Sequence, residues 1–205
     1  MPLAALVGWI LWALVVLVLR NRLHVARTGK SAIFVRETSR MGAHVRFAGA
    51  LLVLAKLLVP VTIALAWSGK SLWWDSGAPW ARAAALATFV AGLGGTFACQ
   101  LAMRASWRIG IDASTRTELV TGGPFRYSRN PIYVFVVVSA LSLFLALPCA
   151  SSLAVVVLAA VGFDLHVRWA EEPFLIALHG ERYLEWASRT GRFVPGIGKL
   201  RAARD

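Results

Sequence analysis

Apolar residues along this chain gather in five blocks, separated by polar segments that are mostly basic. The blocks cover residues 3–19, 47–67, 80–103, 132–147 and 151–169. A helix needs about 20 apolar residues to cross roughly 30 Å of hydrocarbon. Helices are expected because backbone groups exposed to lipid must find their hydrogen-bond partners within the same segment. The pattern therefore predicts an all-α integral membrane protein with about five transmembrane helices.

The last two blocks are predicted to form a tight helical hairpin. Only Pro148, Cys149 and Ala150 separate them, and the fourth block is short. We therefore expect the fourth helix to be tilted or to stop short of a full crossing. In the third block, small residues recur on one face, which is typical of closely packed membrane helices. These residues are Gly92, Gly94, Gly95 and Ala98.

The chain turns polar after the fifth block. Residues 171–179 and 181–190 are predicted to form two short amphipathic helices, broken at Gly180. No internal repeat or low-complexity linker is present, so residues 1–205 are expected to form a single membrane domain. Within it, residues 1–103 make a three-helix part and residues 104–205 carry the candidate chemistry.

The positive charge is distributed unevenly along the sequence. The chain is 58% hydrophobic, and its formal net charge is +12. Residues 20–46, 104–130 and 168–205 hold nineteen of its twenty-two Lys and Arg residues. This asymmetry predicts an outer N-terminus and a cytoplasmic C-terminus by the positive-inside rule. It also accounts for the charge without nucleic acid as a partner. Residues 20–46 fit either a basic loop or an interfacial helix.

Residues 121–133 combine glycine, proline, arginine and aromatic residues immediately before the fourth apolar block. Asn130 is a favourable N-cap, and Pro131 suits the first helical position, so the pair could simply start a helix. A helix N-terminus also offers free amides and positive potential to an anion. Arg126 and Arg129 strengthen that second interpretation, because arginine can bind a carboxylate through two hydrogen bonds.

Ionisable residues gather near the end of the fifth block. Asp164 and Arg168 have the i, i+4 spacing of a helical ion pair, so a structural and a catalytic role are both open. Glu171 and Glu172 are adjacent like charges and need a nearby cation. An arginine from residues 104–130 or a ligand could supply it.

The histidines and cysteines show no pattern of metal ligation. No His-Glu-x-x-His motif or cysteine cluster occurs, so we predict no metal site. Cys99 and Cys149 are expected near opposite faces of the membrane, too far apart for a disulfide. The four histidines are His24, His44, His166 and His179.

Two separated motifs in the second half resemble the isoprenylcysteine carboxyl methyltransferase family. Residues 119–133 read LVTGGPFRYSRNPIY, against a family pattern of approximately LVxxGPYRYxRHPxY. Residues 171–195 contain Glu-Glu, then HGERYLEW, then RFVP, which is similar to the family's acidic pair, FGEEYxxY and closing RFxP. The resemblance covers roughly residues 100–196. The wider group includes phospholipid methyltransferases and membrane sterol reductases.

The resemblance implies a membrane methyltransferase that uses S-adenosylmethionine. The acceptor would be lipophilic, such as the carboxylate of an isoprenylcysteine-like or other lipid substrate. Arg168 would face this acceptor, and Glu172 would steer the donor or accept a proton, so both are candidate catalytic residues. The implied cofactor-binding residues are Leu119, Val120, Tyr127, Arg129, Asn130, Tyr133, Glu171 and Glu172.

Two positions depart from the family pattern. Asn130 stands where the family has histidine, and Phe135 stands where a small residue is common. Asparagine can form hydrogen bonds but cannot titrate near neutral pH as histidine does. A mechanism that requires a histidine base at position 130 is therefore put in doubt.

Two other functions remain open at the level of sequence. A membrane reductase of the sterol reductase type, using NADPH, could share the loop and tail motifs, and a non-enzymatic membrane scaffold would need neither motif. The compact, Ala- and Arg-rich chain with short loops predicts the inner membrane of a prokaryotic cell. The expected partners are membrane lipids and a lipophilic or lipidated substrate.

Overall fold

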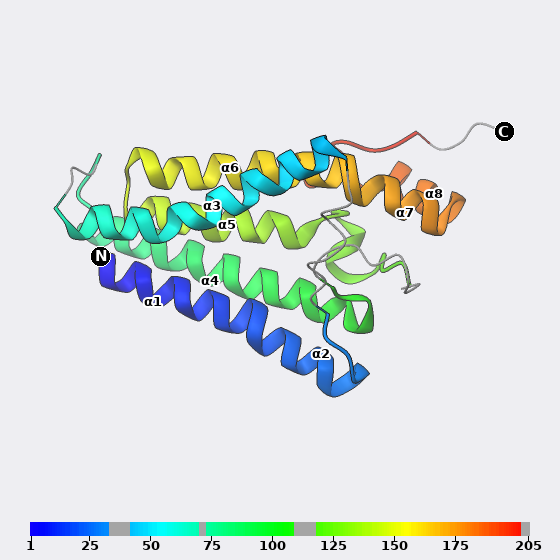
Figure 1. Cartoon of the computed structure of the whole chain (residues 1–205), viewed down its shortest axis with the longest axis horizontal. Helices are drawn as coiled ribbons and strands as arrows, with labels where there is room; N and C mark the ends of the chain where they lie inside the picture. The colour runs from blue at the N-terminus through cyan, green and yellow to red at the C-terminus, as the bar shows by residue number, and fades with distance from the viewer. Residues whose placement is uncertain (33–41, 70–72, 109–117, 202–205) are drawn as a thin grey trace.

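The helices lie side by side along one direction and form a bundle (Figure 1). The computed structural model describes residues 1–32, 42–69, 73–108 and 118–201. Four helices are long and apolar enough to cross a membrane, and a fifth apolar helix is shorter. The prediction of an all-α integral membrane protein is thus confirmed. The four long helices are Pro2–Thr28, Ala43–Trp67, Pro79–Ala102 and Ala150–His179, and the shorter one is Pro131–Ala146.

The first helix extends beyond its apolar block. It consists of α1 (Pro2–Ala13), the π-helix η1 (Leu14–Leu19) and α2 (Arg20–Thr28) without interruption. It ends at Gly29, whose φ of 72° reverses the chain. Residues 20–28 thus continue the helix, whereas residues 33–41 lie outside the described part of the chain.

A buried cation docks α2 against the end of α4 (Pro79–Ala102). Arg20 is fully buried and donates hydrogen bonds to the carbonyl oxygens of Gln100 and Arg104, the latter at 2.8 Å. Its guanidinium lies 4.4 Å from the ring centroid of Trp107, within the range of a cation–π contact. This residue, which the sequence presents as one of many basic charges, is part of the packing.

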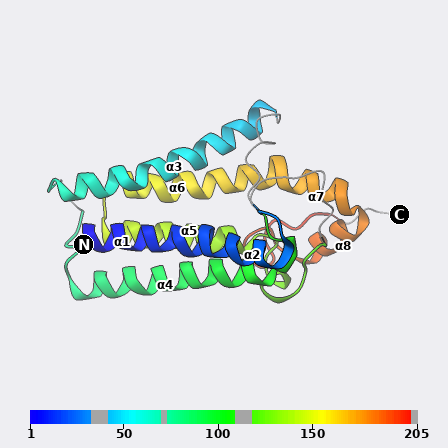
Figure 2. The same ribbon diagram turned by 60° about the horizontal axis from the view of Figure 1, so that its bottom comes forward.

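Two pairs of helices form the body of the bundle. α3 (Ala43–Trp67) lies along α6 (Ala150–His166), and α4 lies along α5 (Pro131–Ala146), with α1 beside α4 and α5 (Figure 2).

The predicted glycine face of the third block packs α4 against α5. A Cβ added at Gly92 would lie 2.6 Å from the backbone nitrogen of Ser139, and one at Gly95 would lie 2.2 Å from the Phe135 ring. Gly94 has no neighbour within 4 Å and does not take part. The large Phe135, one of the departures from the family pattern, is accommodated by the absence of a side chain at Gly95.

The short connection between α5 and α6 forms the predicted hairpin. The hydroxyl of Ser152 accepts a hydrogen bond from the Cys149 backbone N–H at 3.1 Å and so begins α6. Leu147 is fully buried, and the Pro148 carbonyl accepts a hydrogen bond from Trp73 at 2.8 Å. This contact ties the hairpin to the segment before α4.

The polar segment after the fifth block forms two short helices, as predicted. The π-helix η5 (Val167–Glu171) extends α6 and leads into α7 (Glu172–His179). Gly180, with a φ of 55°, separates α7 from α8 (Glu181–Arg189). Together with α2 and the 3₁₀ helix η4 (Gly123–Arg126), these helices lie at one end of the bundle, which we call the basic end (Figure 1). The basic segments thus meet at one end, and which side of the membrane it faces stays a prediction.

Candidate functional site

A loop before α5 is held in place by the tail after α8. The backbone N–H of Arg129 donates to Gly191 O at 2.9 Å, and that of Asn130 donates to Arg192 O at 3.1 Å. Ser128 and Gly191 form an isolated parallel β-bridge. The two segments therefore lie side by side, joined by these backbone contacts, although about sixty residues separate them in sequence.

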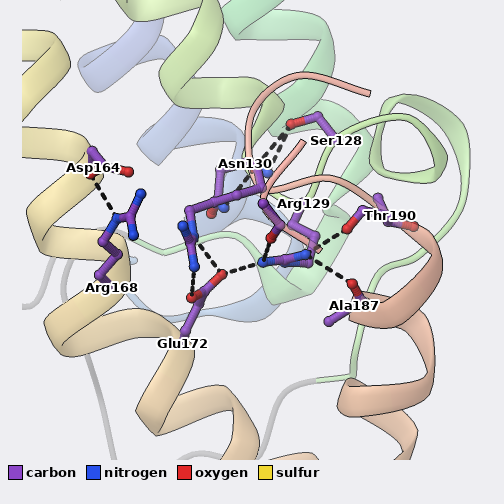
Figure 3. A network of polar contacts seen from close by, with 10 residues as sticks. Ser128, Arg129, Asn130, Asp164, Arg168, Glu172, Ala187 and Thr190 are labelled. Carbon is purple, nitrogen blue, oxygen red and sulfur yellow. Dashed lines mark hydrogen bonds and ion pairs between the residues drawn. The ribbon is translucent and has the colours of Figure 1, made fainter. Parts of the chain in front are cut away.

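Glu172 is the centre of a buried ionic network at this junction (Figure 3). Its carboxylate accepts hydrogen bonds from Arg192 Nε and Nη2, each at 2.9 Å, and from Arg129 Nη2. Glu172 and Arg129 are only 5% and 4% exposed. A bidentate guanidinium–carboxylate pair of this kind is geometrically specific. Hydrogen bonds to Glu172 raise the pKa of Arg192 above its ordinary value, so this cation remains charged.

Besides pairing with Glu172, Arg129 binds the C-terminal end of α8. Its Nη1 donates to the carbonyl oxygens of Ala187, at 3.1 Å, and Thr190, and its Nη2 donates to Gly198 O at 3.0 Å. The last carbonyls of a helix have no intrahelical partner and carry partial negative charge. One guanidinium thus joins α7, the end of α8 and the tail.

Asn130 occupies the predicted N-cap position without using its side chain as a cap. Pro131 is the first residue of α5, as predicted, but no side-chain capping bond is formed. The Asn130 amide instead donates from Nδ2 to Arg192 O at 3.0 Å. The side chain therefore supplies a hydrogen-bond donor to the tail.

A separate polar cluster forms around Glu171. Tyr133 Oη donates a hydrogen bond to Glu171 Oε1, and His166 Nε2 lies 3.5 Å from the same oxygen. The Tyr133 ring stacks on Phe163, with 4.3 Å between ring centroids. The adjacent carboxylates of Glu171 and Glu172 thus have different cationic or donor partners, which removes the repulsion expected from the sequence. The expected arginine from residues 104–130 is Arg129, paired with Glu172.

Asp164 and Arg168 form the i, i+4 ion pair that their spacing predicted. Arg168 Nε lies 2.7 Å from Asp164 Oδ2, and the Arg168 side chain is 50% exposed. Figure 3 shows this pair to one side of the network around Glu172. Contact with a methyl acceptor stays a prediction for Arg168.

The remaining predicted cofactor residues divide between the interior and the surface. Leu119 and Val120 pack against a buried cluster that includes Phe125, Tyr183 and Trp186. Burial raises the pKa of the Tyr183 phenol, which stays neutral. Tyr127 is exposed, and the guanidinium of Arg126 lies 5.2 Å from the centroid of its ring.

Two residues outside the predicted set contribute to the site. Arg192 holds Glu172 from the tail, and His166 contacts Glu171 from the end of α6. The sequence signal for Arg192 was its place at the head of the closing Arg-Phe-x-Pro segment. His166 was recognisable as a histidine close to an acidic pair, but no spacing rule identified its partner.

Comparison with known proteins identifies one family. A family model described as phospholipid methyltransferase matches residues 80–182, half of the chain, from α4 to the start of α8. Neither the comparison with curated proteins nor that with solved structures gives a match. The matched region starts earlier than the 100–196 expected from the motifs. It includes residues 119–133 and the acidic pair but ends before Arg192.

Proposed function

Since the chain belongs to the phospholipid methyltransferase family, we propose that it transfers a methyl group from S-adenosylmethionine to a lipophilic acceptor at one face of the membrane. The family groups with isoprenylcysteine carboxyl methyltransferase-like membrane enzymes, so the resemblance found in the motifs is confirmed at this level. Membership makes the protein a membrane methyltransferase. The donor, the acceptor and the site residues belong to our proposal.

The observation that carries the proposal is the construction of the basic end. There, the loop before α5, the acidic pair and the tail bring buried charged groups beside helices that can span a membrane. Buried ionisable groups next to membrane-spanning helices are costly and usually serve a function. In our proposal, the polar donor reaches this end of the bundle from the aqueous phase and the acceptor reaches it from the lipid.

Unused hydrogen-bonding capacity supports a ligand at the same place. Near this junction, Arg129 Nε, His166 Nδ1 and Trp186 Nε1 are among the buried side-chain atoms of the described residues that have no hydrogen-bond partner. Native structures leave few buried polar atoms unpaired, so each calls for an explanation. S-adenosylmethionine would suit this environment, because its carboxylate could accept hydrogen bonds from the Arg129 and Trp186 donors and its sulfonium and ammonium groups favour the Glu171 carboxylate.

Methyl transfer requires the protein mainly to position the two reactants. S-adenosylmethionine supplies a methyl group already activated by its positive sulfur. The protein must hold the acceptor atom in line with that methyl group and keep water away. In our proposal, Glu171 and Tyr133 meet the donor's polar groups, and the Glu172 network keeps the loop in shape.

Equilibrium binding to the purified protein in lipid nanodiscs tests the proposal. We expect S-adenosylmethionine to bind and NADPH not to bind. Glu171→Gln should weaken donor binding about tenfold or more, because one charge-assisted interaction contributes about 1.5–3 kcal/mol. Glu185→Gln, an exposed change on α8, is the matched control and should bind normally. Binding of NADPH alone would indicate a reductase, and binding of neither would indicate a scaffold.

A further inference from the structure

His166 and Glu171 have the arrangement of a histidine held by a carboxylate. His166 Nε2 lies 3.5 Å from Glu171 Oε1, and the imidazole side chain is only 14% exposed. Its other nitrogen, Nδ1, is buried without a hydrogen-bond partner. One nitrogen of the ring therefore lies beside an acid, and the other has no hydrogen-bond partner among the described residues.

The nearby carboxylate favours one nitrogen of the ring as the basic one. A carboxylate accepts hydrogen bonds, so it favours the tautomer that carries its proton on Nε2. The neutral ring then has its lone pair on Nδ1. When Nδ1 takes up a proton, the adjacent Glu171 charge stabilises the imidazolium that forms, as in other carboxylate–histidine pairs.

Tyr133 joins this pair, and three other polar or charged groups near it have contacts of their own. From α5, Tyr133 donates to the same oxygen of Glu171. On the helix of His166, Asp164 and Arg168 are paired with each other. From α3, His44 lies against the ring of Trp169, with 5.7 Å between centroids.

We propose that His166 is the general base of the methyl transfer and that Glu171 orients it; this inference rests on the proposed function. It places a histidine base at the end of α6 in a chain whose loop carries Asn130, a residue that cannot serve as a base. The role has a chemical consequence. A base is needed only if the nucleophile first carries a proton, as an ammonium does and an ionised carboxylate does not.

The step balances for a primary ammonium acceptor. His166 Nδ1 takes one proton from the acceptor nitrogen, which leaves a neutral amine with a lone pair. That lone pair forms a bond to the methyl carbon. The carbon–sulfur bond breaks, and its electron pair stays on sulfur, which becomes a neutral thioether. The products are a methylated ammonium and an imidazolium beside Glu171, which returns its proton to water.

His166→Gln tests this role, because glutamine can still donate a hydrogen bond to Glu171. Wild type and variant are compared in nanodiscs with radiolabelled S-adenosylmethionine. Dioleoyl phosphatidylethanolamine serves as the amine probe, and N-acetyl-S-farnesylcysteine serves as the carboxylate probe. His179→Gln, on the neighbouring α7, is the matched control.

We expect His166→Gln to slow transfer to the amine about 100-fold or more, the usual contribution of a general base. Donor affinity should stay within about twofold of wild type. The wild-type rate with the amine should rise with pH through the neutral range, as a base loses its proton, and this rise should be absent in His166→Gln. The His179→Gln protein should retain both the rate and the pH profile.

Two results would overturn the role of His166 while leaving the proposed function in place. One is a His166→Gln protein that methylates the amine at the wild-type rate with the wild-type pH profile. The other is a wild-type protein that methylates only the carboxylate probe. Failure of the wild-type protein to bind S-adenosylmethionine would refute the proposed function and this role together.

Discussion

Replacing Glu172 with glutamine removes the charge at the centre of the buried network while keeping the size of the side chain. The carboxylate accepts three hydrogen bonds, one from Arg129 and two from Arg192. An amide has one acceptor oxygen and one donor nitrogen. Whichever way it is oriented, at least one arginine N–H will face the amide N–H₂ instead of an oxygen.

The cost of this change follows from burial. Losing one charge-assisted hydrogen bond costs about 1.5–3 kcal/mol. Arg129, which is 4% exposed, would also keep its charge without a counterion, and breaking a buried ion pair from one side costs about 3–5 kcal/mol in total. We expect Glu172→Gln to lose about 3 kcal/mol of stability, a fall in melting temperature of roughly 6–12 °C for a chain of this size.

Thermal unfolding in nanodiscs measures this loss, with Glu185→Gln as the control. Glu185 pairs with Arg189 at 3.0 Å, but their side chains are 69% and 71% exposed. An exposed pair of this spacing contributes about 0.3–0.5 kcal/mol. The two variants make the same chemical change, so the difference between them reports the burial of Glu172 together with its second arginine partner.

Equal and small shifts in the two variants would refute this reasoning. They would mean that Arg129 and Arg192 do not depend on Glu172 for their charge balance. If the Glu172→Gln protein melts normally but no longer binds the methyl donor, Glu172 contacts the ligand directly, as the motif resemblance implies.

Two further predictions concern the packing and the orientation of the bundle. Gly92→Ala should destabilise the protein by about 1–3 kcal/mol, because the added Cβ would press on the Ser139 backbone. Gly94→Ala should be tolerated, because nothing lies within 4 Å of its added Cβ. Equal melting temperatures in the two variants would contradict the α4–α5 packing. In a protein without Cys99 and Cys149, an impermeant thiol reagent applied to intact cells should label Ser68→Cys but not Ser188→Cys; labelling of Ser188→Cys alone would reverse the predicted topology.

The membrane helices were predictable because their signal is local and strong. Each apolar block coincides with a helix to within a few residues at most boundaries, and Gly180 separates α7 and α8 as expected. The first helix runs to Thr28 although its apolar block ends at residue 19, and the last long helix runs to His179 although its block ends at residue 169. Hydropathy marks where the lipid ends, whereas a helix continues as long as its backbone bonds are satisfied.

The candidate site was predictable only in part, because its contacts join distant segments. The sequence indicated that Glu171 and Glu172 needed a cation and that residues 104–130 could supply it. It did not indicate that the two acids would take different partners. It also did not place Arg192 beside Glu172, because that contact depends on the turn after Gly191. A Cβ on Gly191 would lie 2.0 Å from Val194 O, so only glycine fits the turn.

The hydrogen bonds by which Arg129 holds the end of α8 and the tail have a consequence for biogenesis. Its carbonyl partners at Ala187 and Gly198 follow it by 58 and 69 residues. At about 5–20 residues per second, the ribosome needs roughly 3–14 s to add them. During that interval the arginine has no protein partner from the tail, and anionic lipid headgroups are the natural counterions at a membrane surface. If lipid headgroups hold Arg129 during that interval, closing the loop exchanges lipid for protein, and we expect the completion of this end of the bundle to follow translation and to depend on the lipid composition of the membrane.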